Sequence, residues 1–352
     1  MVGIDSSVEE LIPSYLGHGD HVYMIGICGT GGLGKTTLAR VIYDMFCKNF
    51  EGSSFIPNVR EDSEKYGLPQ LQQQLLVEIL KKRNIEIRDV VVGVDMIRRR
   101  LCDEKVLIVL DDVDKLDQLK ALAGEHYWFG RGSWIIITTR YEHLLVQYGV
   151  DKIYNLSELN AHDALKLFCL KAIKKEQPLG GYKQLFQDIV GYANSLPLAL
   201  VTLGSHLIDK WISGFESTLV SLGRIRGREI LEVLKVSYNG LSEMQKEIFL
   251  DVACFFSGQP KYRVIKILNV CGLYASIGIN VLINKSLICI ANQKLWMHDL
   301  LQEMGREIVC RESRVEPGKR SRLWLCEDLT HVLTKDKVRT MTKLEFYFKE
   351  QD

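Results

Sequence analysis

The sequence feature that most constrains the fold is a glycine-rich loop at residues 29–37. It reads GTGGLGKTT and fits the whole pattern G-x-x-x-x-G-K-[ST]. A short apolar run, residues 22–28, precedes the loop, and an apolar-periodic helical stretch begins at Lys35. In the order strand, loop and helix, this pattern marks a phosphate-binding loop rather than a chance glycine-rich turn.

The loop predicts a site for the phosphates of a nucleotide. Its glycines let successive backbone N–H groups turn inward around an anion, and the helix that follows points its positive end at the same place. Lys35 is expected to reach the β- and γ-phosphates, and Thr36 to offer its hydroxyl to Mg²⁺. The predicted loop residues are Gly29, Thr30, Gly31, Gly32, Leu33, Gly34, Lys35, Thr36 and Thr37.

Length and charge narrow the class of protein. At 352 residues the chain has room for two or three domains, since a domain usually runs to about 100–200 residues. The formal net charge is only +1, so no overall field attracts nucleic acid or an anionic membrane. The basic runs at residues 81–83 and 98–100 lie in amphipathic helical stretches and are interpreted as solvated helix faces.

Cysteine usage and hydropathy indicate the compartment. The nine cysteines include no C-x-x-C pair, and an odd number in mostly apolar surroundings fits buried thiols in a reducing environment. The amino-terminal residues resemble no signal peptide, and no apolar run reaches the roughly 18 residues of a membrane span. We expect a soluble protein that is cytoplasmic or nucleo-cytoplasmic.

Residues 1–150 alternate between β-rich runs and helical patterns. The runs VYMIGIC, SSFIPNV, VLIVLDD and SWIIITT are apolar throughout, as in the central strands of a parallel sheet covered on both faces. This predicts a doubly wound α/β domain. We also expect another strand to lie in the sheet between the strand before the phosphate loop and the acidic strand at residues 106–112.

The pattern becomes helical after residue 150. Residues 151–222 predict a small helical domain. Residues 223–336 contain further helices and then two short β-like runs, at 287–290 and 294–297. Helices followed by a β-hairpin resemble a winged helix. The last segment, 337–352, is assigned to a divergent carboxyl-terminal tail.

Charged residues follow two of the predicted strands. The run at 106–110 ends in Asp111 and Asp112, at the carboxyl edge where parallel sheets bind ligands. Asp111 is the candidate for holding Mg²⁺ through water, and Asp112 for orienting the attacking water. The alternative is a helix cap. Arg140, after the run at 133–139, can contact a γ-phosphate, the alternative being a solvated arginine.

Taken in order, the motifs resemble the NB-ARC nucleotide-binding module of plant intracellular immune receptors with leucine-rich repeats. Two strings, LDDVD and FLDVACFF, further resemble the class with a Toll/interleukin-1-receptor-like amino-terminal domain. The resemblance implies a STAND/AAA-like P-loop NTPase domain followed by a helical and a winged-helix domain. The strings that carry it are MVGIDSSVEEL, GTGGLGKTT, FIPNVRE, KVLIVLDDVD, GSWIIITTR, SLPLAL, FLDVACFF and MHDLLQEMGREIV.

The resemblance also implies a role for residues that chemistry alone leaves undecided. Pro197 would pack near the adenine, and His298 would approach the β-phosphate of ADP, although a proline or histidine in such a place is usually structural. The segment Val2, Gly3 and Ile4 would close over the base. By the same resemblance Asp111 would hold magnesium, Asp112 the hydrolytic water, and Arg140 would sense the γ-phosphate.

Two departures from the family pattern matter. Ser195 stands where a glycine usually opens the GLPL string. No signalling domain precedes Met1 and no leucine-rich repeats follow residue 337, so the chain is expected to lack the flanking domains of such receptors.

Three functions remain open. The first is an ADP/ATP switch of defence signalling, off with ADP and on with ATP, whose copies could self-associate. The second is an ATPase, for which an aspartate at position 112, in place of the usual glutamate, predicts slow turnover. The third is a non-catalytic regulator that pairs with full-length receptors of the same class. Nucleic-acid binding is disfavoured by the neutral charge.

Overall fold

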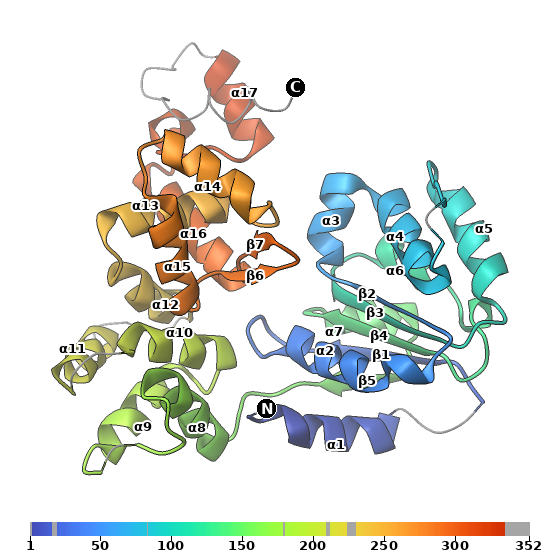
Figure 1. Cartoon of the computed structure of the whole chain (residues 1–352), viewed down its shortest axis with the longest axis horizontal. Coiled ribbons are helices and arrows are strands. Elements are labelled where there is room, and N and C mark those ends of the chain that lie inside the picture. Colours follow the sequence, from blue (N-terminus) through green and yellow to red (C-terminus); the bar gives the residue numbers. More distant parts are fainter. Residues whose placement is uncertain are drawn as a thin grey trace. The chain divides into compact units, whose positions relative to one another are not determined.

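The computed structural model describes residues 2–15, 20–82, 84–178, 180–208, 212–223 and 230–334. The chain forms two compact units, Met1–Leu159 and Asn160–Asp352 (Figure 1). The predicted tail, 337–352, lies outside the described residues.

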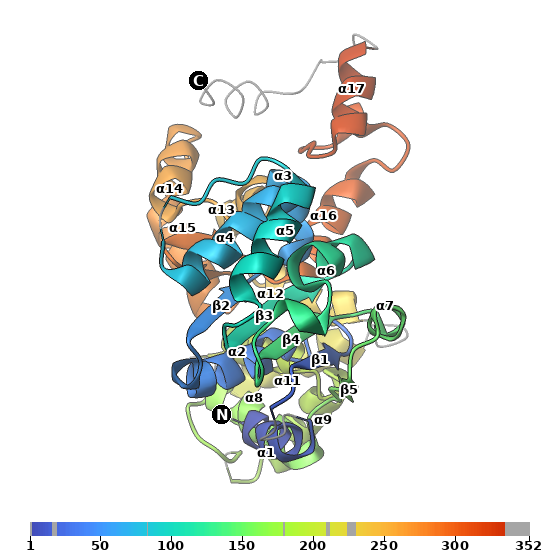
Figure 2. The same cartoon turned by 90° about the vertical axis from the view of Figure 1, so that its right-hand side faces the viewer.

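The first unit is built on a parallel five-stranded sheet, seen edge-on in Figure 1 and turned by 90° in Figure 2. The strand order is β2-β3-β4-β1-β5, and every neighbouring pair is parallel. The strands are β1 (Tyr23–Cys28), β2 (Gly52–Ile56), β3 (Val106–Val113), β4 (Trp134–Thr139) and β5 (Lys152–Asn155).

Both faces of this sheet are buried, which explains why its central strands are apolar throughout. Ile25 and Leu107 pack on one face with residues from α1 (Ile4–Tyr15) and α2 (Lys35–Phe46). The adjacent residues along the strands point to the opposite face and pack against the remaining helices of the unit. These are α3 (Val59–Tyr66), α4 (Leu68–Leu80), α5 (Val90–Leu101), α6 (Leu116–Ala123) and α7 (Glu142–Tyr148).

The predicted insertion of a strand is confirmed. β4 lies between β1 and β3, although it follows both of them in sequence. Its residues pair with both neighbours, Ile136 with Ile25 on one side and with Val109 on the other. β5 pairs with the other edge of β1, so the sheet continues to Asn155, beyond residue 150.

The second unit opens with helices packed around aromatic side chains. Phe168, Phe186 and Phe215 are fully buried, with ring centroids 5.6 Å and 5.0 Å apart along the series. The helices that supply or flank them are α8 (Ala161–Ala172), α9 (Lys183–Tyr192), α10 (Pro197–Leu207) and α11 (Ile212–Gly223). The hydroxyl of Ser237 donates to the carbonyl of Thr202 at 3.2 Å and so ties α10 to the helix that follows.

The remaining elements have the order expected for a winged helix. The two strands β6 and β7 pair antiparallel through a two-residue turn, in which Asn292 and Gln293 both have positive φ, as a tight hairpin turn requires. The elements are α12 (Ile230–Asn239), α13 (Glu243–Asp251), a π-helical turn (Val252–Phe256), α14 (Lys261–Val270), α15 (Ala275–Asn284), β6 (Cys289–Ala291), β7 (Lys294–Trp296), α16 (Asp299–Glu312) and α17 (Cys326–Thr334).

A buried ion pair fixes the segment between α16 and α17. The Nε of Arg322 donates to Oδ1 of Asp251 at 2.6 Å, and its Nη2 donates to Oε2 of Glu247 at 2.8 Å. Burial by itself would lower the pKa of Arg322, but the two carboxylates raise it above its usual value. Arg322 therefore stays charged, and its segment is anchored to α13.

The sequence also predicts buried cysteine thiols and no apolar run long enough to span a membrane. All nine cysteines are free, but only Cys28, Cys169 and Cys254 are buried, so the expectation of buried thiols holds for these three alone. Across the described part of the chain, every helix is too short or too polar to span a bilayer.

The turn before α10 shows the conformational cost of having Ser195 where the family pattern has a glycine. Asn194 and Ser195 both have positive φ, 48° and 53°, and Pro197 then begins the helix, where a fixed φ and a missing N–H are tolerated. Ser195 therefore occupies a left-handed conformation that costs an L-residue about 1 kcal/mol or more relative to glycine.

We predict that Ser195→Gly stabilises the second unit by about 0.5–1 kcal/mol, because glycine adopts this conformation without strain. Urea denaturation measures the change. Ser217→Gly is the control. Its serine lies exposed within α11, where glycine should cost about 0.5–1 kcal/mol. Destabilisation by Ser195→Gly would contradict the strain argument.

Candidate functional site

The glycine-rich loop joins β1 to α2, and its backbone needs glycine at specific positions. Gly29, Gly32 and Gly34 have φ values of 149°, 85° and 101°. A Cβ added at Gly29 would lie 2.8 Å from the Cδ1 of Leu33 and 2.9 Å from the carbonyl oxygen of Leu156. Both the conformation and the space therefore exclude a side chain at Gly29.

The loop ends on the amino terminus of α2, with Gly34 as the cap residue. Among the described residues no side chain caps this end, so the positive end of the helix dipole faces the loop. Lys35 is only 8% exposed, and its Nζ donates to the carbonyls of Gly29 and Thr30 at 2.7 Å and 2.9 Å. The ammonium of Lys35 and the positive end of α2 both suit the phosphates of a nucleotide.

The charge of Lys35 depends on its surroundings. Burial lowers the pKa of Lys35, and the nearby charge of Arg140 lowers it further, while Asp112 acts in the opposite direction. The lysine, Arg140 and Asp112 therefore lie within electrostatic reach of one another at the carboxyl edge of the sheet.

Asp111 is the buried carboxylate of this edge, with 2% exposure. Its Oδ1 accepts hydrogen bonds from Oγ1 of Thr36 at 2.8 Å and from Oγ1 of Thr138 at 2.7 Å. The predicted magnesium residues, Thr36 and Asp111, are therefore in contact. A carboxylate beside a hydroxyl offers the oxygen ligands that Mg²⁺ prefers, and their role as magnesium ligands stays a prediction.

Asp112 adopts an unusual backbone conformation. The β3–β4 pairing shifts register between Leu110 and Val113, and Asp112 has a φ of 56° at this bulge. Its N–H donates to Oγ1 of Thr138 at 2.9 Å. The bulge turns the carboxylate of Asp112 away from the position that a regular strand would give it.

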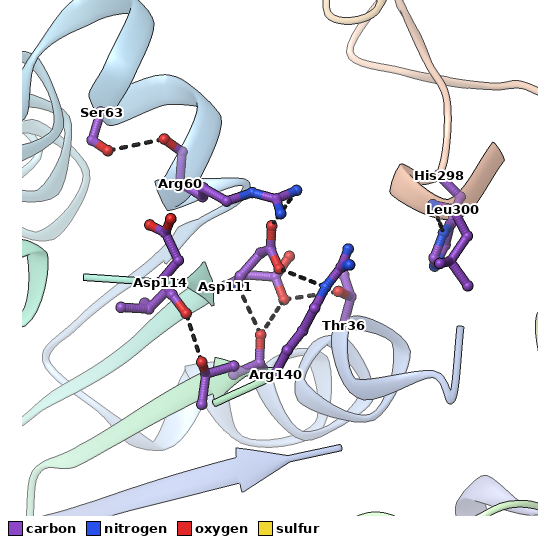
Figure 3. Close-up of polar contacts among 12 residues, drawn as sticks. Thr36, Arg60, Ser63, Asp111, Asp114, Arg140, His298 and Leu300 are labelled. Atoms are coloured by element: carbon purple, nitrogen blue, oxygen red, sulfur yellow. Dashed lines mark hydrogen bonds and ion pairs between the residues drawn. The ribbon is translucent and has the colours of Figure 1, made fainter. Parts of the chain in front are cut away.

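Two arginines, Arg60 and Arg140, which Figure 3 labels, form ion pairs with the carboxylate of Asp112. The Nη2 of Arg60 lies 3.1 Å from Oδ2, and the Nε of Arg140 lies 3.7 Å from Oδ1. The structure thus brings Asp112 and Arg140 together as the sequence order suggested. Their predicted functions, orienting water and sensing the γ-phosphate, remain predictions.

Arg60 is the residue of this cluster that sequence reasoning missed. It lies in the first turn of α3, directly after Asn58 and Val59. A signal was available, because Arg60 belongs to the string FIPNVRE, which follows β2 at the same edge of the sheet. Nothing in that string, however, indicates which acid the arginine meets.

Ile4, from the segment predicted to close over the base, lies beside the phosphate loop. A Cβ added at Gly34 would come 4.0 Å from the Cδ1 of Ile4, and Ile4 packs with the core between α1 and the sheet. Gly3 has a φ of 71° and follows Val2 at the entry to α1. The contact of Val2, Gly3 and Ile4 with a base stays a prediction.

Pro197 and His298 belong to the second unit. Pro197 opens α10, and His298 is the cap residue of α16. The Nδ1 of His298 accepts a hydrogen bond from the N–H of Leu300 at 3.2 Å (Figure 3). In the neutral ring the proton therefore resides on Nε2, which is the form able to donate to an anion. Contacts of Pro197 and His298 with a nucleotide stay predictions.

The hydroxyl of Thr138 is hydrogen-bonded both to the carboxylate of Asp111 and to the N–H of Asp112. We predict that Thr138→Val destabilises the first unit by about 1–3 kcal/mol, because the N–H of Asp112 loses its acceptor and Asp111 loses a donor. Urea denaturation measures the loss. Thr138→Ser keeps the hydroxyl and should retain most of the stability. Equal losses in both variants would rule out the hydrogen bonds as the cause.

Comparison with known families and proteins identifies the chain. The NB-ARC domain family matches residues 4–178. The winged-helix domain of Roq1-like disease resistance proteins matches residues 242–313. The second match covers α13 through α16, including the β6–β7 hairpin, and confirms the predicted winged helix.

Curated relatives point to the same group. Disease resistance protein RUN1 of Vitis rotundifolia is 45% identical over 335 residues, which are 95% of this chain and 25% of the relative. TMV resistance protein N of Nicotiana glutinosa is 39% identical over 343 residues, covering 95% of this chain and 29% of the relative. The chain therefore spans about a quarter of the length of these relatives.

A solved structure shares the fold. A signal transduction ATPase with numerous domains (STAND) from Pyrococcus horikoshii, with a tetratricopeptide repeat sensor, superposes with a TM-score of 0.55 at 20% identity. The match covers 97% of this chain and 46% of that one. The predicted fold class is confirmed, and the fold supports nucleotide binding. By its sequence and its domains, the chain belongs to the NB-ARC family of plant disease-resistance proteins.

Proposed function

We propose that this protein is an ADP/ATP-dependent switch of plant innate immune signalling, off with ADP and on with ATP. The observation that carries the proposal is the cluster at the sheet edge, where Lys35, Arg60 and Arg140 surround Asp111 and Asp112. These three cations outnumber the two carboxylates, so the cluster has a net positive charge that favours binding of a phosphate. The relatives, which are disease resistance proteins, support the biological role.

The residues of this chain divide the work of holding a nucleotide. The loop from Gly29 to Thr37 would hold the phosphates, and Arg140 would contact the terminal one. Thr36 and Asp111 would bind Mg²⁺, which neutralises phosphate charge when present. Val2, Gly3, Ile4 and Pro197 would enclose the adenine, and His298 would donate to the β-phosphate of ADP.

The proposed domains give the switch its parts. Residues 1–150 together with β5 would bind the nucleotide, the rest of 151–222 would form the helical domain, and 223–336 would form the winged-helix domain that reports the bound state through His298. A ligand shifts such a balance only by its differential affinity for the two states, and reversal from 1:99 to 99:1 requires about 5.5 kcal/mol.

A switch fits this site better than a rapid ATPase. The carboxylate of Asp112, the candidate for orienting water, contacts Arg60 at 3.1 Å, so one of its oxygens is engaged by a cation. A shorter acid than glutamate also reaches less far toward a water. We therefore propose slow hydrolysis that resets the switch, catalysed through Asp112.

The first test identifies the nucleotide carried by the purified protein. We predict that denaturation releases ADP in about one equivalent, measured by chromatography of the supernatant. Lys35→Ala removes the buried ammonium that faces the loop and should release little nucleotide. Lys48→Ala, on the exposed turn after α2, is the control. An empty site in the parent protein would overturn the proposal.

The second test concerns the off state. Asp299 opens α16 next to His298, where a carboxylate favours the helix terminus. We predict that Asp299→Val speeds ADP release severalfold and expands the protein in small-angle scattering. Glu303→Val, exposed one turn further along the same helix, is the control. Unchanged ADP retention and unchanged dimensions would count against the switch.

A further inference from the structure

Arg60 and Arg140 reach Asp112 from different elements but make unequal contacts. Arg60 extends from α3 and lies 3.1 Å from Oδ2, whereas Arg140 follows β4 and lies 3.7 Å from Oδ1. The side chains of Arg60, Arg140 and Asp112 are 24%, 21% and 17% exposed. Of these two ion pairs, the one with Arg60 is the shorter, and all three side chains are partly buried.

We propose that Arg60 is the fixed counter-ion of Asp112, and that it allows the site to accept the terminal phosphate of ATP. The inference rests on the proposed nucleotide switch and adds to it a residue that determines the preference between ATP and ADP. Arg60 acts through Asp112 and is therefore a positioning residue.

The backbone prevents Asp112 from moving away. Its left-handed conformation at the bulge and its N–H bond to Thr138, 2.9 Å long, hold the residue at the sheet edge. Because Lys35 experiences the charges of both Asp112 and Arg140, this carboxylate lies within electrostatic reach of the lysine that serves the phosphates. The carboxylate of Asp112 therefore lies near the predicted phosphate site.

The helix turn that carries Arg60 is anchored to the core of the first unit. Val59, its neighbour in α3, is completely buried in the core of the first unit. The hydroxyl of Ser63 donates to the carbonyl of Arg60 at 3.0 Å and closes the first turn of the helix. The side chain of Arg60 therefore extends from an anchored helix turn, which keeps its Cα within reach of Asp112.

The two arginines then have different tasks. Arg140 makes the longer contact and turns from Asp112 toward the terminal phosphate. Arg60 stays on Asp112 and neutralises a carboxylate that would otherwise repel that phosphate. ADP has no terminal phosphate at this position, so its binding depends much less on Arg60.

A double-mutant cycle tests the inference on the whole chain. A fluorescent ADP analogue is bound in the presence of Mg²⁺ and displaced with ADP or with the non-hydrolysable analogue AMP-PNP. The variants are Arg60→Gln, Asp112→Asn and the two combined, with Arg88→Gln as an exposed control that is paired only with a neighbouring glutamate in the contacts described. The measured quantity is the ratio of the two dissociation constants.

We expect Arg60→Gln to weaken AMP-PNP binding about tenfold relative to ADP, because the partly buried carboxylate of Asp112 loses its shorter described ion pair and repels the terminal phosphate more strongly. Arg60→Lys keeps the charge and should restore most of the ratio. In the Asp112→Asn background the carboxylate charge is already gone, so adding Arg60→Gln should leave the ratio unchanged.

Each of three other results would overturn the inference. Equal weakening of both nucleotides assigns Arg60 a structural role only. A loss of AMP-PNP affinity that persists with Asp112→Asn means that Arg60 touches the nucleotide itself. If the parent protein fails to bind the ADP analogue, the proposed switch fails and the inference fails with it.

Discussion

The position of β4 between β1 and β3 is the constraint on which the candidate site depends. Parallel pairing brings the carboxyl ends of three strands to one edge, so the loop after β1, the aspartates of β3 and Arg140 after β4 meet there. Thr138, near the end of β4, then holds both aspartates through one hydroxyl. Strands paired in sequence order would separate the same residues.

Sequence reasoning recovered those parts of the fold that depend on local pattern. The phosphate loop, the start of α2 at Lys35 and the four apolar strands follow from glycine spacing and from burial on both faces. The winged helix followed from helices ahead of two short β-like runs. In each case neighbouring residues carry the signal, and the physical reason acts over a few positions.

Other features depend on contacts between distant residues. The short strand β5 carries little apolar pattern, because only Tyr154 of its four residues is buried. The bulge at Asp112 results from its pairing with β4. The contact between Arg60 and Asp112 joins residues that are far apart in sequence. No local pattern indicates such a contact, even where the motif that contains Arg60 is recognised.

The buried ion pair of Arg322 has a mechanical consequence. Arg322 lies shortly before α17, yet it is bonded to Glu247 in the middle of α13 and to Asp251 at its end. A force that displaces α17 therefore reaches α13 and the π-helical turn after it, instead of being absorbed by the connecting segment that follows α16. Because the salt bridge fixes this segment to α13, a force applied to α17 acts on the core of the winged helix.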